Sequence, residues 1–89
     1  MVIKIELREP WTLHQEKLTL PLDANNCISY ENQLPSVTGQ FLLEEIGVPK
    51  KEICFVRING GSTMLSRDFV KMDIKDGDFV AIFPFSIAG

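Results

Sequence analysis

Long apolar runs and basic clusters are both scarce in this chain. The longest apolar run, residues 79–85, spans seven residues and contains Pro84, whereas a membrane span needs about 20 apolar residues. Lys50 and Lys51 form the only adjacent basic pair, and Glu52 follows them directly. The N-terminal stretch MVIKIELREP alternates charged with apolar residues and has no signal-peptide hydrophobic segment. These scarcities favour a cytoplasmic protein with neither a nucleic-acid partner nor a membrane partner.

Cysteine and histidine are also few, and their spacing matches no known site. Cys27 and Cys54 stand 27 positions apart, there is no CxxC, and His14 is the only histidine. A structural zinc site needs four ligands in recognisable spacing, so we expect no metal and no cofactor. Cys54 falls within an apolar strand pattern and is interpreted as a small core residue, whereas Cys27 is expected in a loop. No motif pairs His14 with a nucleophile.

The composition that remains is typical of a small globular protein. The chain has 89 residues, of which 45% are hydrophobic and 24% charged, and its net charge is −3. This length fits one domain over residues 1–89, and the apolar content argues against disorder.

Two apolar/polar alternations near the N-terminus predict strands. Residues 2–8 place their apolar side chains on one face and charged ones on the other. Residues 16–22 repeat the pattern with three leucines, so we expect the two runs to pair as a hairpin. The polar stretch 23–35 is interpreted as a long loop.

The pattern then changes to a helical period. Positions i, i+3, i+4 and i+7 of one face are occupied by Gly39, Leu42, Leu43 and Ile46. Either Ser36 or Thr38 is the expected N-cap, and Gly47 followed by Pro49 predicts the end. The helix should span about three turns, with Gly39 weakening its first turn.

Strand and turn signals alternate through the rest of the chain. The expected elements are a strand at 53–58, a turn at 59–61, a short strand or helical turn within 63–72, a tight turn at 75–78 and a strand at 79–83. Because the last strand is apolar on both faces, we expect it to be covered on both sides, in the middle of the sheet, and parallel to the first strand. The fold class predicted is α+β: a β-grasp with a mixed sheet of about four to five strands, one main helix on one face, and residues 84–89 as a flexible tail.

Four stretches of the sequence resemble motifs of a known family. They are VRING at 56–60, KDGDFVAIFP at 75–84, the final SIAG, and a helix ending in IGVP at 46–49. Together they resemble the ubiquitin-like sulfur carriers of the MoaD/ThiS type. The length and the Phe-Pro step are most similar to the small subunit of molybdopterin synthase. Two features depart from the family pattern: Ala88-Gly89 stands where Gly-Gly is usual, and the loop at 23–35 is longer.

The resemblance implies a function for the C-terminal residues. The carboxylate of Gly89 would be adenylated by an activating enzyme of the MoeB/ThiF type and converted to a thiocarboxylate for molybdenum or tungsten cofactor (molybdopterin) biosynthesis. The large subunit of molybdopterin synthase would be the second partner, and the carrier would supply no catalytic side chain. The partner-binding residues would be Phe83, Pro84, Phe85, Ser86, Ile87 and Ala88.

The tail residues fit this chemistry physically. Six residues, 84–89, reach about 20 Å when extended. Glycine at the end fits a narrow channel because it has no side chain. Pro84 lacks an N–H and should end the strand ladder, and Phe85 and Ile87 are apolar where we expect exposure, so both should dock on a partner.

Three alternatives remain open. The chain could be a β-grasp interaction module that is never activated, which Ala88 and the long loop favour. It could be a sulfur carrier for thiamine or another thiolation pathway, because fold does not fix function. A small cysteine enzyme would lose activity on Cys54→Ala.

Overall fold

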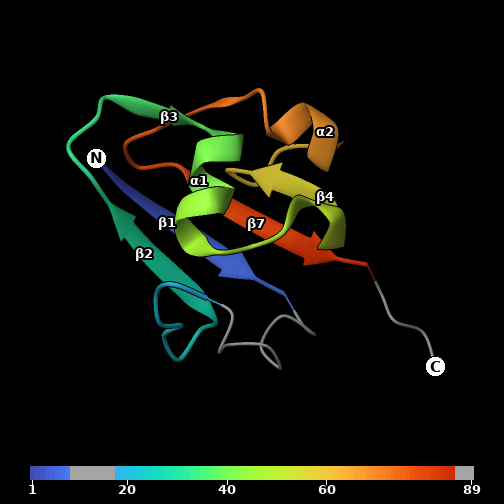
Figure 1. Cartoon of the computed structure of the whole chain (residues 1–89), viewed down its shortest axis with the longest axis horizontal. Coiled ribbons are helices and arrows are strands. Elements are labelled where there is room, and N and C mark those ends of the chain that lie inside the picture. The colour runs from blue at the N-terminus through green and yellow to red at the C-terminus, as the bar shows by residue number, and fades with distance from the viewer. Residues whose placement is uncertain (9–17, 86–89) are drawn as a thin grey trace.

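The computed structural model describes residues 1–8 and 18–85 (Figure 1). The elements in chain order are β1 (Val2–Leu7), β2 (Cys27–Glu31), β3 (Ser36–Thr38), α1 (Gly39–Ile46), the 3-10 turn η2 (Lys50–Glu52), β4 (Ile53–Ile58), β5 (Thr63–Leu65), α2 (Ser66–Phe69), β6 (Asp73–Lys75) and β7 (Phe79–Pro84).

A mixed five-stranded sheet forms the main layer, in the order β2-β1-β7-β4-β5. The last strand, β7, lies between β1 and β4; it runs parallel to β1 and antiparallel to β4. The expectation of a central last strand parallel to the first is therefore confirmed. Helix α1 lies across one face of this sheet, and β3 and β6 form a separate antiparallel pair (Figure 1).

The partner of β1 is not the segment that the sequence predicted. β1 pairs with β2, from Val2↔Glu31 to Glu6↔Cys27, whereas residues 18–22 form no strand and residues 16–17 lie outside the described part. Pro21 lies between two of the leucines and cannot donate to a ladder, which is a physical reason for the error. The three leucines still pack half-buried against the core. Cys27 is accordingly a buried strand residue and not a loop residue.

Helix α1 begins and ends near the predicted signals. Thr38 is the N-cap, since its Oγ1 accepts a hydrogen bond from the Phe41 N–H at 3.1 Å, and Ser36 belongs to β3 instead. Gly47 ends the helix with a left-handed φ of 83° and donates its N–H to the Leu43 carbonyl. The helix has eight residues, so it is shorter than the three turns expected.

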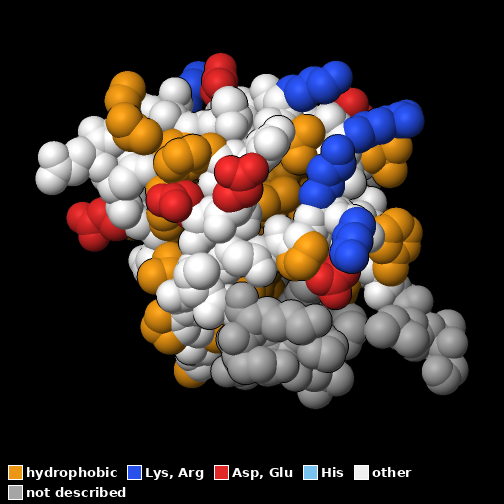
Figure 2. Space-filling model, viewed as in Figure 1, with side chains coloured by type: hydrophobic (Ala, Val, Ile, Leu, Met, Phe, Trp, Pro, Cys, Tyr) orange, Lys and Arg blue, Asp and Glu red, His pale blue; other side chains and the backbone are white. Residues whose placement is uncertain are grey.

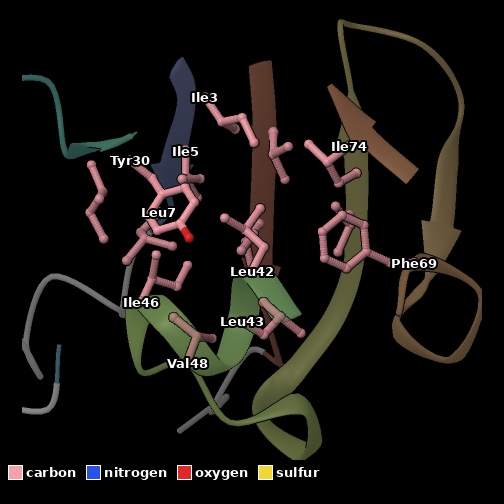
Figure 3. Close-up of a cluster of buried hydrophobic side chains, with 14 of the residues drawn as sticks. Ile3, Ile5, Leu7, Tyr30, Leu42, Leu43, Ile46, Val48, Phe69 and Ile74 are labelled. Atoms are coloured by element: carbon pink, nitrogen blue, oxygen red, sulfur yellow. The ribbon is translucent and has the colours of Figure 1, made fainter. Parts of the chain in front are cut away.

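The core lies between α1 and the sheet. Figure 3 shows Leu42, Leu43 and Ile46 of α1 facing side chains of β1, with Phe69 and Ile74 beside them. Burying each such side chain contributes roughly 1.5–3 kcal/mol. A hydrogen bond also links β2 to the helix: the Tyr30 hydroxyl donates to Glu45 Oε1 at 2.9 Å.

Gly39 has a different role from the one that helix propensity suggests. A Cβ at this position would lie 2.0 Å from the carbonyl oxygen of Phe69. The first turn of α1 therefore packs directly on the backbone at the end of α2, and only glycine leaves room for that approach.

The turns that precede β7 follow their sequence signals. Asn59 and Gly77 both adopt positive φ, 52° and 84°. The carboxylate of Asp78 accepts hydrogen bonds from the Lys75 N–H at 2.8 Å and from Asn59 Nδ2 at 3.0 Å, and so joins the two turns. The ambiguous stretch 63–72 contains both a short strand, β5, and one helical turn, α2.

The expectation that β7 is covered on both faces is correct only for its middle. Val80 and Ile82 point into the core and are fully buried. On the other face Ala81 is buried, but Phe79 is 37% exposed and Phe83 is half-buried. The reason is that α1 covers one face of the sheet and no second helix layer covers the other within the described residues (Figure 1).

Candidate functional site

The end of β7 is the part of the predicted site that the structure describes. Pro84 is the last strand residue and lies opposite Ile53 of β4. The Phe85 N–H still reaches the Glu52 carbonyl at 3.2 Å. The ladder therefore ends one residue beyond the proline, close to the predicted position.

The six predicted partner-binding residues divide into two groups. Phe83 and Pro84 are half-buried, and Phe85 is 56% exposed, more than any other large apolar residue found exposed in the described part of the chain. Ser86, Ile87, Ala88 and the predicted reactive residue Gly89 lie outside the described residues. The loop around Trp11 and His14, residues 9–17, lies outside them too.

Phe83 belongs to an aromatic cluster that the sequence reading did not assemble. Its ring stacks on that of Phe55 of β4, with centroids 4.6 Å apart and planes inclined at 27°. Two guanidinium groups lie over the Phe83 ring, that of Arg8 at 5.2 Å and that of Arg57 at 5.9 Å. We call these four residues the aromatic cluster.

Strand pairing explains why these side chains meet. Phe55 and Phe83 are direct partners in the β4–β7 ladder, and Arg57 is the next residue of β4 on the same face as Phe55. Arg8 follows β1, and its N–H donates to the Ile82 carbonyl at 3.1 Å, which holds the arginine beside β7. Period-two spacing within 53–58 places Phe55 and Arg57 on one face, so this signal could have found them.

The aromatic cluster lies on the face of the sheet opposite α1. The alternation along β7 points Val80 and Ile82 toward the helix and Phe83 away from it. Leu65 of β5, paired with Phe55, adds an apolar side chain that is 48% exposed. A half-buried aromatic pair with flanking arginines is the composition that protein interfaces favour.

Few ion pairs engage the charged side chains of this surface within the described residues. The ion pair between Arg8 Nε and Glu6 Oε1, at 3.4 Å, is the only salt bridge found in residues 1–8 and 18–85. Arg57 therefore keeps its charge for the Phe83 ring and for solvent. A cation over an aromatic face contributes about 0.5–1 kcal/mol at an exposed site.

The cysteines do not form part of this site. Burial, and then the nearby Asp23 carboxylate, raise the pKa of the Cys27 thiol, which disfavours the reactive thiolate. Cys54 is half-buried, at the irregular step of the β4–β7 ladder, and is less buried than a core residue. Within residues 1–8 and 18–85, no group of three or more histidine, cysteine or acidic side chains is arranged to hold a metal ion.

Comparisons with known proteins add no relative. No protein-family model, no curated protein and no solved structure matches the chain. None of the helices in the described part is long and apolar enough to cross a membrane. The case for a function consequently depends on the residues and geometry given above.

Proposed function

We propose that this chain is a ubiquitin-like sulfur carrier of the MoaD/ThiS type with a β-grasp fold, most similar to the small subunit of molybdopterin synthase. In this proposal the Gly89 carboxylate accepts sulfur, and partner proteins bind the surface of the folded domain. The carrier contributes no catalytic side chain.

The arrangement of the sheet supports the β-grasp part of the proposal. Its first two strands are antiparallel, its last strand is central and parallel to the first, and one helix packs across a single face. In such a sheet the chain leaves from the middle of the structure, between β1 and β4, where several strands support the exit point.

One observation carries the functional part. The chain leaves the sheet at the exposed Phe85, next to the half-buried Phe55–Phe83 stack. An apolar, cation-flanked surface beside the exit of a tail is suited to dock on a partner while the tail enters that partner's catalytic pocket. Residues 84–89 reach about 20 Å when extended, enough to enter a deep channel.

The chemistry assigned to the tail balances without any group from the carrier's own side chains. A carboxylate oxygen of Gly89 attacks the α-phosphorus of ATP, pyrophosphate leaves, and an acyl-adenylate forms. Sulfide (HS−) supplied by the activating system then attacks the acyl carbon, the bond from that carbon to the phosphate oxygen breaks, and AMP leaves with the bonding electron pair. The product is a C-terminal thiocarboxylate, whose sulfur passes to an acceptor on the large subunit.

The experiment is incubation of the full chain with its cognate activating enzyme, ATP and a sulfur donor, followed by intact-mass measurement. The proposal predicts a mass gain equal to one sulfur replacing one oxygen. A chain shortened by Gly89 is the matched control, and it should gain nothing. Pyrophosphate exchange by the enzyme with a second carrier that it accepts shows that the enzyme is active, so that an unchanged mass counts against the proposal.

A second candidate is a β-grasp interaction module that is never activated. Ala88, in place of the glycine usual in the family, favours it, since a methyl group in a narrow channel costs about 1 kcal/mol or more. This candidate predicts binding through the aromatic cluster with no mass change. A carrier for thiamine or another thiolation pathway differs only in which acceptor takes up the sulfur.

A further inference from the structure

A groove lies on the opposite side of the molecule from the aromatic cluster. It runs between α1, the segment that follows the helix, and the residue after α2. Its lining includes Gln40, Leu43, Glu44, Val48, Lys50 and Val70. Its volume is about 440 Å³, within the range of sites that hold small ligands or a few side chains.

The floor of the groove is apolar. Leu43 and Val48 line it and belong to the core, while Val70, which also lines it, is half-buried and packs against that core. An apolar side chain placed here would remove from water the surface of Val70 and Pro49 that is still exposed. Removing apolar surface from water is favourable by roughly 25 cal/mol per Å².

Two residues of opposite charge, Lys50 and Glu44, line the groove. Four cations lie on two parts of the chain. Lys50 and Lys51 belong to η2, Arg67 belongs to α2, and Lys71 follows α2 by two residues. Only two carboxylates, Glu52 and Asp68, share those segments. Lys and Arg side chains gather over this side of the molecule, with hydrophobic surface beside them (Figure 2). On the α1 side the rim is Glu44, which accepts a hydrogen bond from Gln40 Nε2 at 3.3 Å.

None of the four cations has a carboxylate within ion-pair distance among residues 1–8 and 18–85. This is notable in a chain of net charge −3, where acidic side chains outnumber basic ones. The segments that supply Lys50 and Val70 to the groove therefore carry an excess of positive charge, and this charge is electrostatically complementary to carboxylates.

We propose that this groove docks a short acidic–apolar segment of a partner protein. An apolar side chain of the segment sits on Val70 and Pro49, and carboxylates beside it face Lys50 and Lys71. Glu44 sets the orientation, because it repels carboxylates placed along α1. The groove and the aromatic cluster lie on opposite sides of the sheet, so this inference does not depend on sulfur transfer, and both surfaces can be occupied at once.

The test is a titration of the 15N-labelled full chain with a synthetic peptide, followed by amide chemical shifts. The probe has two central leucines and two acidic residues at each end. The expected result is saturable shifts at Val48, Lys50 and Val70, with a Kd of about 1 mM or tighter. Two matched probes separate the contributions: one replaces the leucines by serines and one replaces the acids by lysines, and both should bind at least about 10-fold more weakly.

Variants locate the site. Lys50→Glu combined with Lys71→Glu should weaken binding at least about 10-fold, whereas Lys4→Glu, on the opposite face of β1, should leave it unchanged. The substituted lysines are exposed, and unchanged shifts elsewhere show that the variants fold. The proposal is overturned if the peptide causes no saturable shift, if the shifts fall on β4 and β7 instead, or if the lysine-flanked probe binds equally well.

Discussion

Phe83 and Phe55 stack on the face of the sheet that α1 leaves uncovered, with ring centroids 4.6 Å apart. Stacked aromatic pairs contribute about 0.5–1.5 kcal/mol beyond their buried area, so the pair fixes the end of β7 against β4. The tail therefore starts where β7 is packed against β4. We expect partner proteins to contact this packed surface as well as the tail.

Replacement of Phe85 by serine should weaken partner binding without affecting the fold. The side chain is 56% exposed, so the free energy of unfolding should change by less than about 0.5 kcal/mol. The kcat/KM for pyrophosphate exchange by the activating enzyme should fall about 10-fold or more, the size of effect expected for an interface anchor. Leu34→Ser is the control, because Leu34 is similarly exposed, at 48%, but precedes β3, far along the chain from the tail. Equal effects of the two substitutions would show that Phe85 has no special role.

Gly39→Ala should destabilise the protein by about 3 kcal/mol, despite the higher helix propensity of alanine. The added methyl would meet the Phe69 carbonyl at 2.0 Å, and backbone atoms cannot rotate out of the way. Urea unfolding measures the change. Gly60→Asn is the control, because the space around Gly60 is open and asparagine tolerates its φ of 72°, so the loss should stay below about 1 kcal/mol. A stabilising Gly39→Ala would mean that α1 and α2 are farther apart.

The cysteines should prove dispensable for sulfur acceptance. Burial raises the pKa of Cys27, so a maleimide should modify the half-buried Cys54 at least about 10-fold faster. Cys27→Ala and Cys54→Ala should both still gain sulfur on incubation with the activating enzyme. Loss of the mass gain in Cys54→Ala, with an intact fold by circular dichroism, would favour the cysteine-enzyme alternative instead.

Asp23 should stabilise the entry to β2 only in its ionised form. Its Oδ1 accepts the N–H groups of Cys27 at 3.0 Å and of Asn25 at 2.7 Å, and these bonds, that of Cys27 first, lower its pKa below the ordinary 3.8. Because the pKa is lower in the folded state, the contribution is complete above pH 3.8 and is lost as the pH falls through the folded value.

The measurement is the difference in unfolding free energy between the wild type and Asp23→Asn, taken from neutral pH down to about pH 2.5. The wild type should be more stable at neutral pH, and the difference should shrink on acidification. Asp73→Asn, at an exposed position on β6, serves as the comparison. A difference that grows at low pH would contradict the assignment.

Local signals predicted the elements near the tail because each depends on few residues. Glycines at positive φ marked the turns at 60 and 77, a capping threonine preceded α1, and alternation or continuous apolar runs marked β1, β4 and β7. The position of Phe83 near the end of a central strand followed from these signals, whereas Pro84, which the sequence assigned to the tail, is still paired with Ile53. The tail residues that would react, by contrast, stay a prediction.

Long-range pairing explains the misses. The leucines at 18–22 alternate well, but Pro21 and the tertiary partners of the segment decide that β2, not this segment, pairs with β1. The need for glycine at position 39 arises from Phe69, thirty positions away, and propensity cannot reveal it. Arg8 lies over Phe83 because β1 and β7 are neighbours in the sheet, and local signals do not reveal that pairing.

The most direct measurement uses protein labelled with 13C at the glycine carbonyl carbons, exposed to the activating enzyme, ATP and sulfide. In the proposal, Gly89 is the glycine whose carbonyl carbon belongs to a free carboxylate. Conversion to a thiocarboxylate predicts that this one carbon signal moves strongly downfield while the five amide carbonyls stay in place. An unmoved Gly89 signal, with an enzyme that is shown to be active on a second carrier, would contradict the account.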